Sequence, residues 1–192
     1  MSAARDRLLD TATRLFYAEG VHTVGIDRII AEAGIAKATF YRHFRTKDDL
    51  VVAYLAREYE RQRAVLEAVP DSGMAAVTVI FERLGELSCA PGFRGCPFLN
   101  AAVEFPDPAH AVRAVVADYR DWFRRLVRER LAAAGHDDPD TAAHYLLLVR
   151  DGVALSGGLG DPATVRAGVE TALAQLRTRV APTPAPAPAT TA

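Results

Sequence analysis

The chain has 192 residues, half of them hydrophobic, which is enough to bury the core of one domain or two small ones. Its 23 basic residues nearly balance its 24 acidic ones, and the formal net charge of −1 excludes both a polybasic nucleic-acid binder and a highly charged disordered chain. Because Cys89 and Cys96 are the only cysteines in the sequence, a disulfide framework and a four-ligand zinc site are excluded.

Helical periodicity begins at the N-terminus, and the first 45 or so residues predict three short helices. The first starts after Ser2 and ends at Gly20. Thr23 is placed to cap the second, which Gly34 ends. The third covers about residues 36–43.

Longer helices follow. Thr46 and Asp49 have the spacing of a helix cap, and they begin a fourth helix that Pro70 stops. Apolar residues at helical spacing continue through residues 77–87, which favours a helix there over a strand. The remaining helices are expected over about residues 98–105, 108–134, 138–156 and 162–179, and the stretch 89–97 is a loop.

These elements predict an all-α protein of about nine helices, divided into three parts. Residues 1–46 are expected to form one small domain, and residues 47–180 a larger and more apolar one. Residues 181–192 alternate proline and alanine with threonine, which predicts an extended, disordered tail.

The second and third helices, joined at Gly34, have the pattern of a helix-turn-helix. Ala36 and Ala38 keep the start of the third helix narrow enough for the major groove of DNA, and Phe40 can anchor its other side. Residues 37–47 carry a charge of +4, so the rest of the chain sums to −5. A basic segment beside a narrow helix suits phosphate contacts, although a solvated helix face would have similar charges.

Residues 5–50 resemble the DNA-binding domain of the tetracycline-repressor (TetR) family. The matching residues are Arg7-Leu8-Leu9, Ala12, Leu15-Phe16, Gly20, Thr23-Val24, Ile26, Ile29-Ile30, Ala33-Gly34-Ile35, Thr39-Phe40-Tyr41-Arg42-His43-Phe44 and Lys47-Asp48-Asp49-Leu50. Two positions depart from the family pattern, since Ala38 stands where glycine is frequent and Ile30 where alanine is usual.

The resemblance implies that the protein binds double-stranded operator DNA. The residues that it implies for this contact are Thr23, Arg28, Ala36, Lys37, Thr39, Tyr41, Arg42, His43 and Lys47. Of these, Thr23, Tyr41 and His43 are expected to bind phosphates, whereas Ala36, Lys37 and Thr39 are expected to face base edges. Tyr41 and His43 also have structural interpretations, as a core aromatic ring and as a packed imidazole.

The family places a ligand-binding domain in the region that follows, and the segment Gly95–Glu104 resembles one branch of it. Large apolar side chains there would suit a small, largely apolar effector, although an aromatic stripe is more often ordinary core. The candidate effector-binding residues are Phe81, Cys96, Phe98, Asn100, Glu104, Tyr119, Trp122, Phe123, Tyr145 and Arg150. Glu104 has an alternative role as a cap on a neighbouring helix.

Cys96 lies in a glycine-rich loop at the expected start of a helix, an environment that favours a reactive thiolate. Cys89, seven residues away, could act as a resolving thiol if the loop folds back. Sensing of oxidants or electrophiles through Cys96 is therefore an alternative to ligand binding, and an inert buried cysteine is a third interpretation.

The last two helices are the dimer elements of the family, so the resemblance implies a homodimer that reads a palindrome. The candidate interface residues are Val149, Val153, Leu155, Val169, Leu173 and Leu176. No signal peptide or membrane-length apolar run is found in the sequence, which favours the cytoplasm and no membrane contact.

The leading hypothesis is therefore a homodimeric, ligand-responsive repressor. The alternative from another class is a helical enzyme or ligand carrier with a vestigial DNA-binding head. The sequence contains no paired carboxylates, Ser-His-Asp grouping or phosphate loop, and its histidines lack the spacing of metal ligands. We expect no catalytic residue, no metal site and no cofactor.

Overall fold

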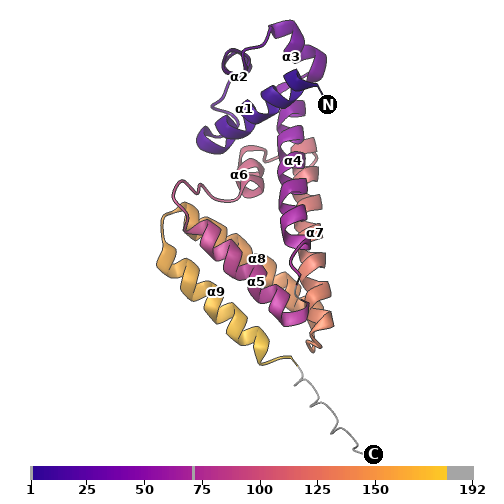
Figure 1. Cartoon of the computed structure of the whole chain (residues 1–192), viewed down its shortest axis with the longest axis vertical. Helices are drawn as coiled ribbons and strands as arrows, with labels where there is room; N and C mark the ends of the chain where they lie inside the picture. The colour runs from indigo at the N-terminus through magenta and orange to yellow at the C-terminus, as the bar shows by residue number, and fades with distance from the viewer. Residues whose placement is uncertain (1, 71, 181–192) are drawn as a thin grey trace, which may run out of the picture.

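The computed structural model describes residues 2–70 and 72–180, and this part of the chain forms nine α-helices and no β-strand (Figure 1). The helices are α1 (Ala3–Glu19), α2 (Ile26–Ala33), α3 (Lys37–His43), α4 (Lys47–Glu67), α5 (Gly73–Ser88), α6 (Pro97–Glu104), α7 (Ala111–Ala133), α8 (Pro139–Gly158) and α9 (Pro162–Arg177). The all-α prediction is confirmed, whereas the expected disordered tail lies outside the described residues. In the described ranges no helix has the length and hydropathy needed to cross a membrane.

Helices α1, α2 and α3 form a small head at one end of the molecule (Figure 1). Leu8 of α1, Ile29 of α2 and Phe40 of α3 are fully buried between them. Gly34 has a φ of 63°, a left-handed conformation that costs glycine little, and it turns the chain sharply from α2 into α3. The turn packs Phe40 into the head and leaves the opposite side of α3 exposed.

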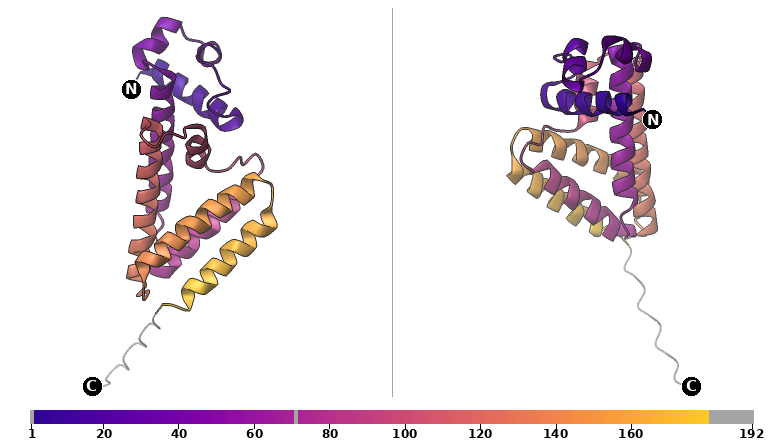
Figure 2. Two further views of the ribbon diagram at one scale, coloured as in Figure 1. Left: turned by 180° about the vertical axis from the view of Figure 1, so that it is seen from behind. Right: turned by 45° about the horizontal axis from the view of Figure 1, so that its top comes forward.

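Helix α4 joins the head to the rest of the protein. It starts with a capping box, in which Thr46 Oγ1 accepts a hydrogen bond from the Asp49 amide and the Asp49 carboxylate accepts one from the Thr46 amide. The predicted cap is therefore confirmed. Further along α4, the Tyr54 ring packs against Phe16 of α1 with 5.8 Å between the ring centroids, and the helix then runs beside α7 (Figure 2).

Helices α5 to α9 form the body, in which α5 and α8 pack on each other and each contacts both α7 and α9, while α6 packs on α7 (Figures 1 and 2). Aromatic rings fill the centre of the body, where Phe98 stacks on Tyr119 with centroids 3.8 Å apart. Helix α8 crosses α5 very closely at Gly157, since a Cβ atom there would lie 2.7 Å from the Cβ of Ser88.

Several expected helix boundaries differ from the observed ones. Helix α2 begins at Ile26 with Gly25 at its N-cap, so exposed Thr23 does not cap it. Helix α7 begins at Ala111 and not near residue 108, because the His110 ring accepts the hydrogen bond of the Val112 amide and supplies the cap. Helix α8 runs two residues beyond residue 156, where it packs on α5.

Candidate DNA interface and effector cavity

The exposed side of α3 presents several of the residues expected to contact DNA. Ala36, Lys37, Tyr41 and Arg42 are all exposed, and the Tyr41 ring packs edge-on against the buried Phe40. Because Phe40 holds this helix in the head, the polar ends of its exposed side chains are available to a partner. A narrow helix with a lysine, an arginine and a tyrosyl hydroxyl on one exposed side can reach both phosphates and base edges.

The two lysines of the basic segment have different surroundings. Lys37 Nζ lies 2.9 Å from the Asp27 carboxylate, and the hydrogen bond to Asp27 raises the pKa of this exposed lysine. Lys47 is half-buried at the start of α4, and its partial burial lowers its pKa. Lys37 would therefore have to leave Asp27 to contact a base edge, whereas Lys47 has less access to solvent.

Three further residues expected to contact DNA are half-buried, hydrogen-bonded within the chain or located outside α3. Thr39 is half-buried on α3, and Thr23 is exposed in the turn after α1. The His43 Nε2 atom lies 3.2 Å from the Ser2 hydroxyl, so this ring contacts the start of α1. His43 could bind a phosphate only by giving up or sharing that contact.

Arg28 is engaged inside the head. Its guanidinium forms a two-bond pair with Glu19 of α1, at 2.5 and 2.8 Å, and its Nε donates to Glu32 at 2.9 Å. Glu32 also pairs with Arg14 of α1. All three nitrogens of Arg28 therefore have carboxylate partners, which brace α2 against α1. The expectation that Arg28 reaches DNA is not supported by this arrangement.

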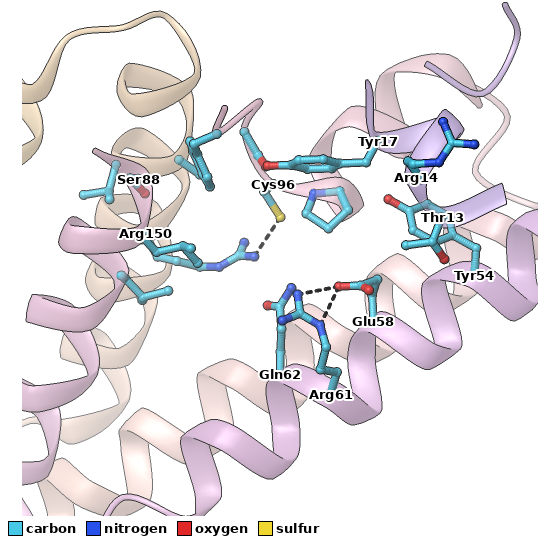
Figure 3. A pocket seen from close by; sticks show the side chains of 17 residues that line it. Thr13, Arg14, Tyr17, Tyr54, Glu58, Arg61, Gln62, Ser88, Cys96 and Arg150 are labelled. Carbon is cyan, nitrogen blue, oxygen red and sulfur yellow. Dashed lines mark hydrogen bonds and ion pairs between the residues drawn. The ribbon is translucent and has the colours of Figure 1, made fainter. Parts of the chain in front are cut away.

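A cavity of about 320 Å³ lies where the head, α4 and the body meet (Figure 3). Its size is at the lower end of the range for small-molecule sites. The wall combines residues from α1, α4, α5, the loop before α6, and α8, namely Thr13, Arg14, Tyr17, Tyr54, Glu58, Arg61, Gln62, Leu84, Leu87, Ser88, Phe93, Gly95, Cys96, Pro97, Arg150, Val153 and Ala154. A molecule bound here would touch the DNA-binding head and the body at once.

Arg150 of α8 is the most deeply buried charge in this wall, with 4% of the residue exposed. Its Nη2 donates to the Cys96 Sγ at 2.9 Å and to the Tyr119 hydroxyl at 3.1 Å, and its Nη1 donates to Asp151 at 2.7 Å. The guanidinium also lies over the Tyr119 ring, 4.8 Å from the centroid. Burial raises the pKa of Tyr119 to about 12, so its hydroxyl is protonated at neutral pH.

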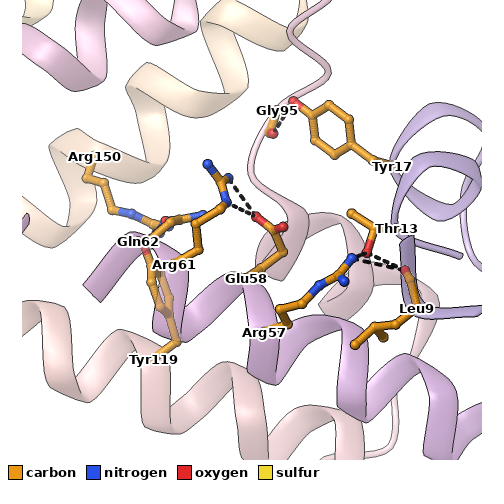
Figure 4. A network of polar contacts seen from close by, with 10 residues as sticks. All are labelled: Leu9, Thr13, Tyr17, Arg57, Glu58, Arg61, Gln62, Gly95, Tyr119 and Arg150. Carbon is orange, nitrogen blue, oxygen red and sulfur yellow. Dashed lines mark hydrogen bonds and ion pairs between the residues drawn. The ribbon is translucent and has the colours of Figure 1, made fainter. Parts of the chain in front are cut away.

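Helix α4 contributes a second polar group on the opposite wall (Figures 3 and 4). The buried carboxylate of Glu58 accepts two hydrogen bonds from Arg61, at 2.6 and 3.0 Å. The next turn places Gln62 in the wall, where its Oε1 accepts from the Tyr119 hydroxyl at 2.6 Å. These contacts connect α4 to the Arg150 cluster through side-chain hydrogen bonds.

Of the expected effector residues, the structure places Cys96 and Arg150 in this wall and the others elsewhere. Five aromatic residues belong to the buried core, which corrects their assignment as pocket lining; they are Phe81, Phe98, Tyr119, Trp122 and Phe123. Asn100 donates to the Arg94 carbonyl, and Tyr145 lies partly exposed on α8 with its hydroxyl bonded to Gln175. Aromatic rings at helical spacing pack between helices here, as in most cores.

The polar cavity residues that sequence reasoning missed come from α1 and α4, apart from Ser88 of α5. Tyr54, Glu58 and Gln62 are spaced four apart, which places them on one face of α4. A buried tyrosine followed by polar residues on the same face was a usable signal. Tyr17 gave no such signal, because its place in the wall depends on how the loop before α6 packs on α1.

Helix α6 holds the head at both of its ends. Before its start, the Tyr17 hydroxyl donates to the Gly95 carbonyl at 3.2 Å and accepts from the Arg94 amide at 2.9 Å (Figure 4). At its end, the Glu104 carboxylate accepts hydrogen bonds from the amides of Val21 and His22, at 2.8 and 2.6 Å. Glu104 therefore joins the body to the head and does not line the cavity.

The expected dimer residues divide into two groups. Val153, Val169, Leu173 and Leu176 are buried within the single chain, where they pack α8 and α9 onto the body. Val149 is half-buried and Leu155 is 62% exposed. The exposed apolar residues of α8 are Tyr145, Leu148 and Leu155, and Leu159 follows at its C-terminal end.

Across the described ranges, no group of three or more histidine, cysteine, aspartate or glutamate side chains is arranged to hold a metal ion.

Comparison with known proteins points to one family. Residues 8–54 match the family described as "Bacterial regulatory proteins, tetR family". The chain is 45% identical to SCO4454, a TetR-family transcriptional regulator from Streptomyces coelicolor, with a TM-score of 0.81 over 90% of this chain and 95% of that one. A putative regulator from Streptomyces avermitilis also has a TM-score of 0.81, at 28% identity, over 92% of this chain and 99% of that one. The transcriptional regulator LmrA of Bacillus subtilis is 28% identical over 69% of this chain and 73% of its own length.

Proposed function

The chain belongs to the TetR family of bacterial transcriptional regulators, and from this premise we propose that it is a homodimeric repressor released from its operator by a small molecule. As a member of this family it is a DNA-binding regulator and not an enzyme. We place its action in the cytoplasm, where chromosomal DNA is accessible. The observation that carries the proposal is the cavity whose wall is shared between α1 of the head and the helices of the body.

Because α1 of the head forms part of the cavity wall, a ligand in the cavity can change the position of the head. A molecule that fills the cavity contacts Tyr17 on α1 and competes with the packing of Tyr17 on the loop before α6. Because α3 is packed on α1, a shift of α1 also moves α3. The ligand favours release only to the extent that it binds the shifted arrangement more tightly than the DNA-bound one.

Two heads are needed, since one short helix reads too few base pairs to be specific. The exposed apolar residues Tyr145, Leu148 and Leu155 recur at intervals of three and seven along α8, so they form a stripe on one side of the helix. Small exposed residues of α9, such as Ala167 and Thr171, leave room for close approach of a partner helix. We propose that this α8–α9 face is the dimer interface, in place of the four buried residues expected from the sequence.

A reporter experiment tests the sign of regulation. DNA flanking the gene drives a reporter, and the intact chain is supplied from a second plasmid. Lower transcription with the chain than without it is the expected result, and the Tyr41→Phe variant, which lacks the exposed hydroxyl on α3, should repress less. Higher transcription would contradict a repressor, and unchanged transcription together with no binding to that DNA would contradict regulation at this site.

A second candidate for the sensing step is the Cys96 thiol, favoured by its place in the cavity wall 2.9 Å from Arg150 Nη2. Cys89 lines other grooves, so it does not face Cys96 across this cavity. Hydrogen peroxide would convert the thiol to a sulfenic acid with loss of water. Peroxide should then release DNA from the wild type and from Cys89→Ser but not from Cys96→Ser, and release from all three would exclude Cys96 as the sensor.

A further inference from the structure

Positive charge exceeds negative charge around the cavity. Its wall holds three arginines and one carboxylate. Arg61 and Glu58 form an ion pair at 2.6 Å, which neutralises that part of the wall. Arg14 is 63% exposed at the side chain and pairs with Glu32, outside the wall. The remaining cation, Arg150, is the one that solvent screens least.

Asp151 balances Arg150 only in part. Its Oδ1 accepts from Arg150 at 2.7 Å, and its Oδ2 accepts from Arg120 at 2.6 Å, so one carboxylate serves two guanidinium groups. The three side chains together carry a charge of +1. A buried cation is costly unless a counter-charge and hydrogen bonds compensate it, so this cluster attracts an additional anion.

The hydrogen bonds of Arg150 indicate where that anion would lie. Its Nη2 donates to the Cys96 sulfur, and sulfur is a weak acceptor. A carboxylate oxygen makes a shorter and stronger bond to a guanidinium, often as a two-bond pair. Exchanging the sulfur for a carboxylate would therefore improve the contacts of a side chain that already points into the cavity (Figure 3).

Apolar side chains cover the space beside Arg150. Leu84 and Phe93 line the wall from α5 and from the loop before α6, and Val153 lies one turn beyond Arg150 on α8. We propose that the cavity binds an amphipathic monoanion, whose carboxylate pairs with Arg150 and whose apolar or aromatic body packs on these three residues. This inference rests on the proposed function only in identifying that molecule as the effector.

Calorimetry of the intact chain without DNA tests the proposal with three ligands of one skeleton, 2-naphthoate, 2-naphthamide and 2-naphthylmethylammonium. The carboxylate should bind about tenfold more tightly than the amide, because a charge-assisted bond replaces a neutral one. The ammonium compound should bind most weakly, since it meets a net positive wall. Equal or tighter binding of the amide or the ammonium compound would overturn the proposal.

Because 2-naphthoate is only one possible size of ligand, a series of carboxylates from benzoate to 4-phenylbutyrate is also tested for binding. Failure of every member, 2-naphthoate included, to bind at millimolar concentration would also overturn it. Arg150→Gln should abolish the preference for acid over amide, and Arg150→Lys should retain part of it. Arg128→Gln, an exposed α7 arginine paired with Asp140, is the control that should keep the full preference. If Arg150→Gln does not fold, the wild-type ligand series decides the question alone.

The outcomes separate this inference from the proposed function. If the chain binds the carboxylate but shows no sequence-specific DNA binding, the proposed anion site is supported and the proposed repressor function is contradicted. If the chain binds DNA specifically but shows no preference for carboxylates, the proposed anion site is contradicted and the proposed repressor function is not affected.

Discussion

The Glu104 carboxylate, at the last residue of α6, accepts a 2.6 Å hydrogen bond from the backbone amide of His22, at the turn that leaves α1. A second bond at 2.8 Å comes from the Val21 amide beside it. The two amides lie in the DNA-binding head and Glu104 in the body, so this carboxylate fixes the position of one relative to the other. Its side chain is 22% exposed, and charge-assisted bonds of this kind are stronger than neutral ones.

Glu104→Ala should therefore loosen the contact between head and body. We expect a loss of about 1–2 kcal/mol in the free energy of unfolding, below the sum for two charge-assisted bonds because the site is partly exposed. Glu104→Gln keeps one acceptor oxygen and should lose less. Urea denaturation measures both, and equal stability of all three proteins would show that the contact does not hold the head.

The crossing of α8 over α5 gives a prediction about packing. At Gly157 a Cβ atom would overlap Ser88, including its backbone, so Gly157→Ala should destabilise the protein by about 1–3 kcal/mol. Gly85→Ala on α5 is the matched control, because its Cβ would meet Val169 at an ordinary 3.5 Å. That change should stabilise the helix by about 1 kcal/mol. Thermal unfolding of the pair should shift in opposite directions, and a shift of the same sign would contradict the close crossing.

The Asp161 carboxylate is expected to account for part of the loss of stability at acidic pH. This carboxylate caps α9, and the hydrogen bonds from Thr164 hold the pKa of Asp161 below its usual value of 3.8. Because the folded pKa is the lower one, the ionised group stabilises the protein above pH 3.8, and this contribution disappears as the pH falls through the folded pKa.

Asparagine can cap a helix without a charge, so Asp161→Asn should lose less stability than the wild type between pH 5 and pH 3. Asp161→Ala should be less stable than both at pH 7. Melting temperatures across this pH range measure the difference. If the melting temperatures of the wild type and Asp161→Asn fall equally with pH, Asp161 does not contribute to the loss of stability in acid.

A charged substitution in the proposed dimer face should change the mass of the protein in solution. Leu148 is 68% exposed in the middle of the α8 stripe, and a glutamate there would bury a charge in the interface. Leu148→Glu should lower the mass in solution from twice 20.7 kDa to 20.7 kDa, whereas Val65→Glu, at an exposed position of α4, should not. Sedimentation equilibrium measures both, and an unchanged dimer in Leu148→Glu would place the interface elsewhere.

Local signals predicted the head and the start of α4 well. The Gly34 turn, the buried Phe40 and the Thr46–Asp49 cap all depend on residues close together in the sequence, and each lies where the pattern placed it. The cap assigned to Thr23 failed because Gly25 begins α2 without a side-chain cap. The ion pair of Arg28 was not predicted because its partner Glu19 belongs to another helix, and spacing does not reveal such a pair.

The cavity was harder to predict, because its wall is built from five separate segments. Cys96 and Arg150 were identified as candidate effector-binding residues, yet their mutual contact joins residues 54 positions apart. Core aromatic residues such as Phe81 have the same helical spacing as a pocket lining, so sequence alone does not separate the two. The position of α6 against α1 decides which residues face the cavity, and that position is a tertiary property.

Equilibrium titration of the chain with operator DNA across a salt series tests whether α3 is the helix that reads DNA. The wild type should protect a palindrome with two protomers and lose affinity steeply as salt rises. Lys37→Ala should lose about tenfold in affinity for the operator and much less for unrelated DNA, because a base contact is lost at each head. Equal affinity for operator and unrelated DNA, with no effect of Lys37→Ala, would contradict the account of α3 as the DNA-reading helix.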